Sequence, residues 1–141
     1  MPKSPVLVLD ASVVAKRFIQ EGDSAKADKL LDAIEQGHWR AATPSLLRAE
    51  LAHVLWKKKR RGYDRDMAVY VFEEFDKFGF DEVSMDELFP HALEASYSYR
   101  ITIYDAFYVA LAEAIGGTLA TFDKELIRKT KGRSPITILH P

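Results

Sequence analysis

Short apolar segments alternate along this chain with longer segments of helical periodicity. We expect the short segments to be strands at residues 6–9, 39–42, 80–83, 118–121 and 136–139. Strands that alternate with helices favour a parallel sheet covered on both faces, because each parallel connection must cross from one end of the sheet to the other. The sequence therefore predicts an α/β fold with a central, mainly parallel sheet.

The segments between the strands carry helical patterns. We expect helices that begin at residues 23–24, run from Thr43-Pro44 to about residue 60, include residues 67–78, run from Pro90 through Tyr97, span residues 103–115 and follow Asp123. Pro90 is placed in a first turn, where its missing N–H group is not needed. Residues 103–115 are apolar nearly all round, so this helix is expected to be deeply buried.

The composition narrows the classes of protein and site. The 141 residues, 48% hydrophobic and 29% charged, indicate one ordinary globular domain spanning residues 1–141. The absence of cysteine excludes disulfides, thiolate zinc sites and cysteine nucleophiles. No apolar run approaches the roughly 20 residues of a membrane span. Only four apolar residues, Val6 to Leu9, follow the N-terminal Met-Pro-Lys-Ser-Pro, too few for a signal peptide. We therefore expect a cytoplasmic protein without membrane association.

Two acidic residues lie at predicted strand ends. Asp10 follows the first strand directly, and Asp123 lies one residue beyond the fourth. Ligands of open α/β sheets bind beyond the carboxyl ends of the strands, so both side chains are expected in the same crevice. Each residue also precedes a helix, and either could be its N-cap. Both interpretations stay open for Asp10 and Asp123.

Two further acids lie on helices that should be buried. Glu50 comes three residues after Leu47 and four before Val54, on a helix face without lysine or arginine. Asp105 precedes seven uncharged residues, although a helix N-terminus favours negative charge and a capping role is also possible there. A buried carboxylate is costly unless it has a partner or a metal ion. Glu50 and Asp105 are therefore the acids that are hardest to explain structurally.

A divalent cation would explain the four acids together. Mutual repulsion opposes a carboxylate cluster without cations, and Mg²⁺ and Mn²⁺ prefer oxygen ligands. Such an ion draws charge from phosphate oxygens, lowers the pKa of a bound water and stabilises the departing oxyanion. The acids therefore predict metal-dependent hydrolysis of phosphodiester bonds, without a covalent nucleophile.

Four short motifs carry a family resemblance. They are Val8-Leu9-Asp10-Ala11-Ser12 with Lys16 and Glu21 following, Ala49-Glu50-Leu51, the run from Tyr104 to Ala112, and Ala120-Thr121-Phe122-Asp123-Lys124. In these motifs the sequence resembles the PIN-domain family and, within it, the VapC-type toxins of type II toxin–antitoxin systems. Their order and spacing cover essentially the whole chain. Ala11 departs from the threonine of many relatives, but the neighbouring acid and serine are present.

The resemblance implies a three-layer α/β/α sandwich and an endoribonuclease with one or two Mg²⁺ or Mn²⁺ ions per active site. It also implies an RNA substrate, inhibition by a small cognate antitoxin, and a homodimer. Asp10, Glu50, Asp105 and Asp123 fall on the family's acidic quartet. Asp10 and Asp105 match the principal metal ligands, while Glu50 and Asp123 would bind metal directly or through water. Ser12 and Thr121 match hydroxyl positions that orient the acids or waters.

Basic residues are candidates for RNA contacts. The net charge of −1 gives no global attraction to nucleic acid, but residues 57–61 form one basic run and residues 124–133 carry five basic residues against one acid. Solvated helix ends are the alternative interpretation of both runs. The candidate RNA-binding residues are Lys16, Lys57, Lys58, Arg60 and Lys124. Trp56, beside the first run, is either packed or free to stack on a base.

Other side chains leave fewer possibilities. The four histidines have no ligand spacing between them, so we expect no zinc site. The aromatic stripe Tyr70, Phe72, Phe75 and Phe78 is either core or a surface for a second copy or the antitoxin.

Two other functions compete with the ribonuclease toxin. One is a PIN module that binds RNA or protein without turnover. The other is an enzyme that uses Asp10 as a phosphoacceptor, but such phosphatases need a second aspartate where Ser12 stands.

Overall fold

A five-stranded sheet runs through the centre of the molecule, and its neighbouring strands are all parallel. The computed structural model describes residues 4–141. The strands are β1 (Val6–Leu9), β2 (Arg40–Pro44), β3 (Asp81–Val83), β4 (Thr118–Ala120) and β5 (Thr137–Leu139), in the spatial order β3-β2-β1-β4-β5. The predicted parallel sheet is therefore confirmed, with β1 in its middle.

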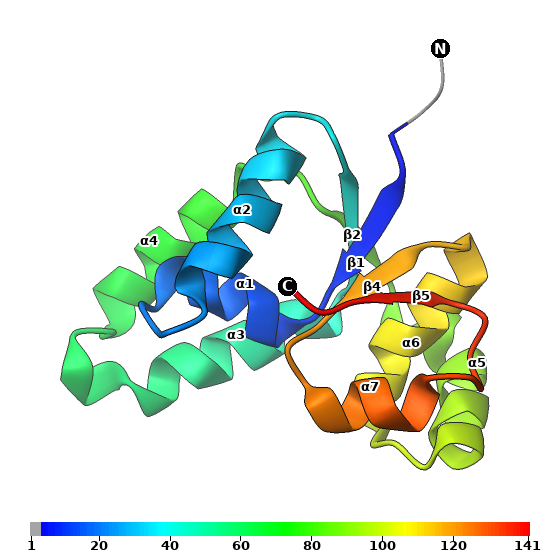
Figure 1. Ribbon diagram of the computed structural model, residues 1–141. Coiled ribbons are helices and arrows are strands. Elements are labelled where there is room, and N and C mark those ends of the chain that lie inside the picture. Colours follow the sequence, from blue (N-terminus) through cyan, green and yellow to red (C-terminus); the bar gives the residue numbers. More distant parts are fainter. Residues whose placement is uncertain (1–3) are drawn as a thin grey trace.

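Helices cover both faces of this sheet (Figure 1). They are α1 (Ala11–Phe18), α2 (Ser24–Glu35), α3 (Leu46–Lys57), α4 (Arg65–Asp76), α5 (Met85–Tyr99), α6 (Ile103–Ile115) and α7 (Lys124–Thr130), with a 3₁₀ turn at Lys59–Arg61. Helices α1 to α4 lie on one side and α5 to α7 on the other (Figure 1). This arrangement confirms the α/β/α sandwich.

The core is built around β1 and α6. Residues 7–9 of β1 are fully buried, and every residue of α6 from Ala106 to Ala112 is buried. Helix α6 packs against β1, β2 and β4, as its nearly uniform apolar surface predicts. Both elements therefore give a rigid base to the residues at their ends, Asp10 after β1 and Asp105 in the first turn of α6.

The predicted start of α5 is wrong. The helix begins at Met85, and Pro90 lies inside it rather than in its first turn. Ser84 caps the helix by accepting a hydrogen bond from the Asp86 N–H at 3.1 Å. Glu87 stands three residues after Ser84, which is the sequence pattern of a capping box. Pro90 suggested that the helix begins near residue 90, so the capping pattern at Ser84 and Glu87 was overlooked.

Other boundaries move by one to three residues, as is common at the ends of elements. Pro44 is the last residue of β2, so α3 begins after Ser45 rather than at the proline. Gly62 ends the 3₁₀ turn with a φ of 100°. In the part of the chain from residue 4 onward, no helix is both long and apolar enough to span a bilayer. The expectation for the N-terminal segment includes Met1 to Lys3, which lie outside the described residues.

Candidate functional site

Asp10 lies where β1 and β4 end side by side. Leu9 pairs with Ala120 across these strands, and the Asp10 N–H donates to the Ala120 carbonyl at 3.3 Å. The Asp10 carboxylate also caps α1, since Oδ1 accepts from the Val13 N–H at 3.2 Å. The N-cap interpretation is therefore confirmed. A cap engages only one carboxylate oxygen, so it does not account for the rest of the group.

Two hydroxyls hold the Asp10 carboxylate in place. Ser12 Oγ donates to Oδ1, and Thr121 Oγ1, which is fully buried, donates to Oδ2. Thr121 Oγ1 also accepts from the Asp123 N–H at 3.0 Å and so links two of the acids. Burial raises the pKa of Asp10, and the Asp105 charge adds to this effect, while the hydrogen bonds from Ser12, Thr121 and Val13 oppose it. The net result is a raised pKa.

Glu50 lies on α3 at the edge of its apolar face. Leu47 and Leu51 on that face are fully buried, but Glu50 itself is only half-buried. The Tyr108 hydroxyl on α6 donates to Glu50 Oε1 at 2.5 Å. Burial raises the pKa of Glu50, and the charges of Asp105 and Asp10 raise it further, against the effect of the Tyr108 hydrogen bond. Glu50 is thus held by one donor while two carboxylates repel it.

Asp105 lies in the first turn of α6 and does not cap it. Thr102 is the N-cap, and its Oγ1 accepts from the Asp105 N–H at 3.1 Å. The capping alternative for the Asp105 carboxylate is therefore wrong. Burial and then the Asp123 charge raise the pKa of Asp105, and the Thr102 hydrogen bond and the Lys129 charge only partly oppose them. This carboxylate has no structural duty in its own helix.

Asp123 is exposed and caps α7. Its Oδ1 accepts from the N–H groups of Glu125 and Leu126 at 3.0 and 3.1 Å. The N-cap interpretation is confirmed here too. The cap fixes the carboxylate near the end of β4, from where its charge acts on Asp105.

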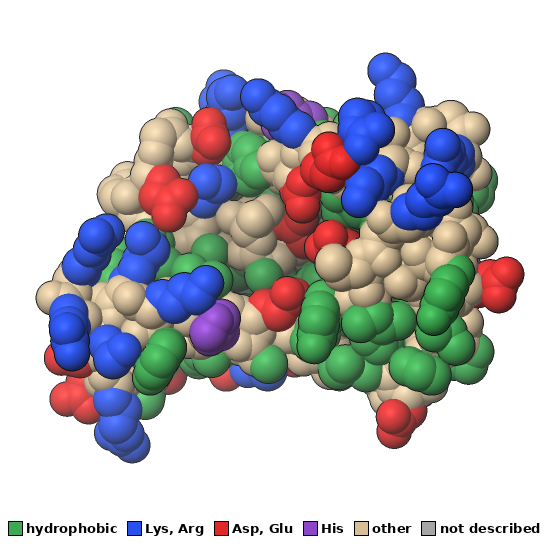
Figure 2. Space-filling model, turned by 90° about the horizontal axis from the view of Figure 1, so that it is seen from below, with side chains coloured by type: hydrophobic (Ala, Val, Ile, Leu, Met, Phe, Trp, Pro, Cys, Tyr) green, Lys and Arg blue, Asp and Glu red, His purple; other side chains and the backbone are tan. Residues whose placement is uncertain are grey.

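The structure thus brings all four predicted acids to the carboxyl edge of the sheet. Figure 2 views this face and shows acidic side chains gathered near its centre. Asp10, Glu50 and Asp105 repel one another, and Asp123 repels Asp105. Within residues 4–141, none of the four forms an ion pair. The cluster therefore carries negative charge without direct neutralisation.

The donor set fits a hard divalent ion with few protein ligands. All the clustered groups offer oxygen, which Mg²⁺ and Mn²⁺ prefer. Among the described residues, no three acidic or histidine side chains are arranged to hold one ion together. Mg²⁺ in phosphate-processing sites is usually bound through one or two carboxylates and keeps several waters. Asp10 and Asp105, whose charges act on each other, supply carboxylates of that kind.

A groove of about 620 Å³ opens beside Glu50. Its lining residues are Ala11, Ser12, Leu46, Ala49, Glu50, His53, Val54 and Tyr104. Trp56 is 60% exposed, so the packed interpretation of this residue is wrong. Its ring stacks against His53 at 6.0 Å, and the Lys59 ammonium lies 3.6 Å from its centroid. The Trp56 ring is thus joined to the groove beside Glu50 through His53, which lines it.

The predicted basic residues differ in their surroundings. Lys16 pairs with Glu21 at 2.9 Å, and Lys58 approaches the same carboxylate at 4.0 Å. Lys57, Arg60 and Lys124 are exposed. Contact of these five residues with RNA stays a prediction.

Sequence reasoning missed two residues next to the acids. Tyr108 follows Asp105 by three residues and thus shares its helix face, a spacing that could have identified it. The charge of Lys129 acts on Asp105. Lys129 lies on the same side of the sheet as α6 because it belongs to α7, which follows β4. No local pattern distinguishes it from the other lysines of its run.

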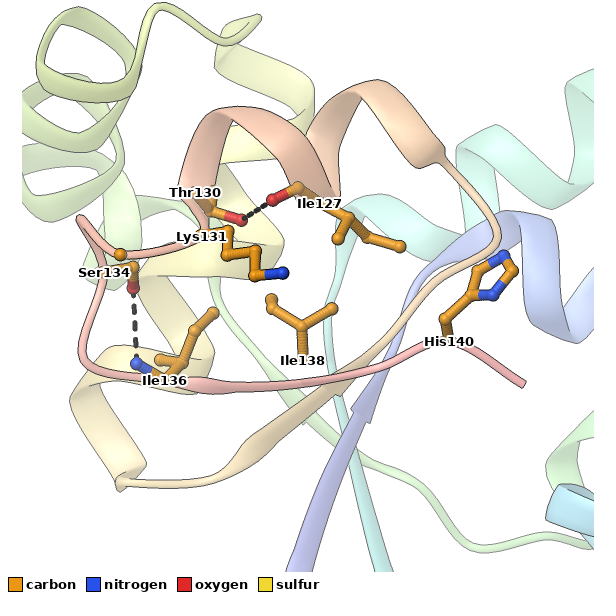
Figure 3. Close-up of a pocket in the computed structure, with 8 residues that line it drawn as sticks. Ile127, Thr130, Lys131, Ser134, Ile136, Ile138 and His140 are labelled. Atoms are coloured by element: carbon orange, nitrogen blue, oxygen red, sulfur yellow. Dashed lines mark hydrogen bonds between the residues drawn. The ribbon is translucent and has the colours of Figure 1, made fainter.

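Another cavity, of about 330 Å³, lies between α7, the loop after it and β5 (Figure 3). Ile127 and Ile138 face each other across it, and Lys131 extends over it (Figure 3). Its lining residues fall between positions 127 and 140 and include none of the four acids.

Comparison with known proteins gives consistent matches. The model of the PIN domain family matches residues 7–132. Ribonuclease VapC3 of Pyrobaculum aerophilum is 37% identical over 126 residues, which cover 87% of this chain and 93% of that protein. The crystal structure of PAE2754 from Pyrobaculum aerophilum has a TM-score of 0.63 at 27% identity, with 96% and 91% of the two chains covered. VapBC2 from Rickettsia felis, crystallised with a DNA fragment from its promoter, has a TM-score of 0.70 at 17% identity, with 95% and 97% covered.

Proposed function

The chain belongs to the PIN domain family and resembles its VapC-type toxins, and from this premise we propose that it is a metal-dependent endoribonuclease. The observation that carries the proposal is the cluster of Asp10, Glu50, Asp105 and Asp123, whose charges repel one another at one edge of the sheet. A site that concentrates unpaired carboxylates suits a cation and a phosphate ester better than an anionic substrate alone. The ribonuclease name of the Pyrobaculum relative supports RNA as the substrate.

Asp10 and Asp105 are proposed as the principal ligands of Mg²⁺ or Mn²⁺. Glu50 and Asp123 would contribute directly or through water, to one or two ions. When bound, the ion would supply charge for the phosphate oxygens and a more acidic water.

The remaining side chains prepare the carboxylates for this role. Ser12 and Thr121 fix both oxygens of Asp10, and Tyr108 fixes one oxygen of Glu50. Because these donors are anchored on α1, on the β4 end and on α6, the acids stay oriented when the substrate arrives.

A groove remote from the acids is proposed to receive the antitoxin. It has a volume of about 420 Å³ and lies between α1, α2 and α4. Met67 and Tyr70, on its α4 wall, are 40% and 53% exposed, whereas Phe75 is core. An amphipathic helix binds such a groove with its apolar face. We expect inhibition of the toxin by a small partner of that kind, in the cytoplasm.

A second apolar surface is proposed as the homodimer contact. Phe89, Leu93 and Tyr97 lie at four-residue intervals on α5 and are 48%, 43% and 81% exposed. Residues four apart share one helix face. A continuous apolar stripe of this kind favours burial against a second copy.

The alternative is a PIN module that binds RNA or protein without turnover. A module of this kind would bind RNA equally well with and without divalent ions. Thermal unfolding separates the two proposals: Mg²⁺ should raise the Tm of the parent and raise that of Asp105→Asn much less, whereas equal Tm values with and without Mg²⁺ would favour the module.

The proposed toxin is tested by mapping the 5′ ends of cellular RNAs after induced expression. The parent should create new ends and arrest growth, and the Asp105→Asn variant at equal abundance should do neither. Growth without arrest, or the same ends with both proteins, would contradict the proposal.

A further inference from the structure

A small cavity beside the acid cluster is lined mainly by cations. Its volume is about 280 Å³, and its lining residues are Tyr99, Arg100, Arg128, Lys129 and Arg133. They come from the end of α5, from α7 and from the loop that follows α7. Of the basic residues at positions 124–133, the sequence singled out only Lys124. Nothing in the sequence indicated that Arg100 lies beside α7.

Most of the positive charge in this cavity is not neutralised. Glu125 pairs with Arg128 and lies 3.9 Å from Lys129. Within residues 4–141, Arg100 and Arg133 form no ion pair. Only Arg128 and Lys129 of the four cations therefore have a carboxylate nearby, and it is the same one. Figure 2 shows basic side chains crowded beside the central acids.

The backbone holds these cations together. Arg100 ends α5 in the left-handed conformation with φ 56°, a position that glycine usually occupies. Its carbonyl oxygen accepts a hydrogen bond from Lys129 Nζ at 3.0 Å, which draws α7 toward the end of α5. The Tyr99 hydroxyl is engaged by Glu113 at 2.6 Å, so this ring is a fixed wall of the cavity.

The cavity adjoins the acids through Lys129. Burial and the Asp123 charge raise the pKa of Asp105, and the Lys129 charge is close enough to act against them. Arg100 begins the short connection between α5 and α6, and Asp105 lies in the first turn of α6 just after this connection. A chain that contacts the acids can therefore reach the cations.

We propose that this cavity is a phosphate-binding subsite, which holds an internal RNA phosphate next to the one that is hydrolysed. The proposal rests on the proposed ribonuclease function. Guanidinium groups bind phosphate oxygens through paired, charge-assisted hydrogen bonds, and Arg100 and Arg133 are free to do so. The carboxylate cluster alone repels a polyanion, so an adjacent cationic subsite offsets this repulsion.

Binding measurements test this subsite separately from cleavage. Fluorescence anisotropy with a labelled single-stranded RNA in chelator reports affinity whether or not the protein cleaves. Arg133→Ala and Arg100→Ala should each weaken binding about tenfold at low salt and reduce the slope of log K against log salt by about 0.7, the value for one lost phosphate contact on a single strand. Arg65→Ala, which removes an arginine with an 87% exposed side chain on α4, is the matched control and should leave both quantities unchanged.

Modified substrates identify the phosphate that is bound. One neutral methylphosphonate linkage is placed at each internal position of the RNA in turn. At one position it should weaken RNA binding by the parent, and at that position it should not weaken RNA binding by Arg133→Ala. Removing a 5′-terminal phosphate should have no effect on either protein. Sensitivity to the terminal phosphate alone, or equal RNA binding by parent and both variants, would overturn the proposal. So would variants that lose an acidic protein partner while they bind RNA normally.

If the parent cleaves RNA, the variants should raise KM and leave kcat near the parent value, since the subsite does not touch the reacting atoms. If the parent binds RNA through Arg100 and Arg133 but does not cleave it, the subsite stands and the ribonuclease proposal fails.

Discussion

Asp10 and Asp123 cap helices, whereas Glu50 and Asp105 have no comparable structural duty. The sequence predicted this difference, because a cap candidate precedes a helix and a misplaced acid interrupts an apolar face. The family resemblance placed Thr121 among the hydroxyls that orient the acids or waters, and its hydroxyl does donate to Asp10. The hydrogen bond from Tyr108 to Glu50 was not predictable, because it joins segments far apart in the chain.

The Thr121→Val variant tests whether the Thr121 hydroxyl orients Asp10 for cleavage in addition to stabilising the fold. Valine keeps the volume of this fully buried side chain but leaves an Asp10 oxygen without its donor. We expect a loss of about 1–3 kcal/mol in the free energy of unfolding. We also expect RNA cleavage to fall at least tenfold. Urea denaturation and initial rates measure the two effects.

Thr130→Val is the matched control for this change. Thr130 is equally buried, but its hydroxyl donates to the Leu126 carbonyl within α7. It should keep the cleavage rate of the parent. Equal activity of Thr121→Val and Thr130→Val would show that the Thr121 hydroxyl does not position the site.

Helix α6 was predictable as an element, and α5 was only partly so. The apolar run and Gly116 bound α6 at both ends, and the structure agrees from Ile103 to Ile115. The start of α5 was missed because Pro90 was placed in a first turn, whereas the helix begins at Met85 and contains the proline. Glu113 was missed as well: it joins α6 to α5 and to the loop before β5.

Glu113→Gln should lower stability in a pH-dependent way. Burial acts to raise the pKa of Glu113, but hydrogen bonds from Ser134, Tyr99 and His91 outweigh it and hold this pKa below its usual value. A lowered folded-state pKa gives stability that is present above the unfolded-state pKa and is lost as the pH falls through the folded-state pKa. We expect the variant to lose about 2 kcal/mol at pH 7 and less near pH 4.

Urea denaturation at several pH values measures this difference. Glu94→Gln, at an exposed position of α5, should cost little at any pH. A Glu113→Gln deficit that is the same at pH 7 and pH 4 would mean that the ionised carboxylate is not what joins the helices.

At the scale of the molecule, the strand order creates the site. Because β4 lies directly beside β1, Asp123 approaches an acid that precedes it by 113 positions. The alternation of strands and helices predicted a parallel sheet, but several strand orders satisfy that pattern, so the neighbours of β1 could not be read from it. The same packing brings Arg100 against α7, which is why the cationic cavity was not foreseen.

The apolar stripe on α5 leads to a prediction for the assembly. Light scattering after size exclusion should give about twice the 16.0 kDa mass of the chain. Leu93→Lys places a charge in the middle of the stripe and should yield monomers, while Lys26→Ala, at an exposed position of α2, should not. A monomeric parent at micromolar concentration would contradict the dimer.

Cleavage of RNA by the purified protein tests the central claim most directly. The parent should cleave a single-stranded RNA with Mg²⁺ or Mn²⁺ and stop when a chelator is added. Asp105→Asn should stay folded and lose at least a hundredfold in rate, about 2.7 kcal/mol of transition-state stabilisation. Asp66→Asn, which alters an exposed acid on α4, should cleave like the parent. Cleavage that persists in chelator, or that survives in Asp105→Asn, would contradict the assignment of the acid cluster as a metal-dependent nuclease centre.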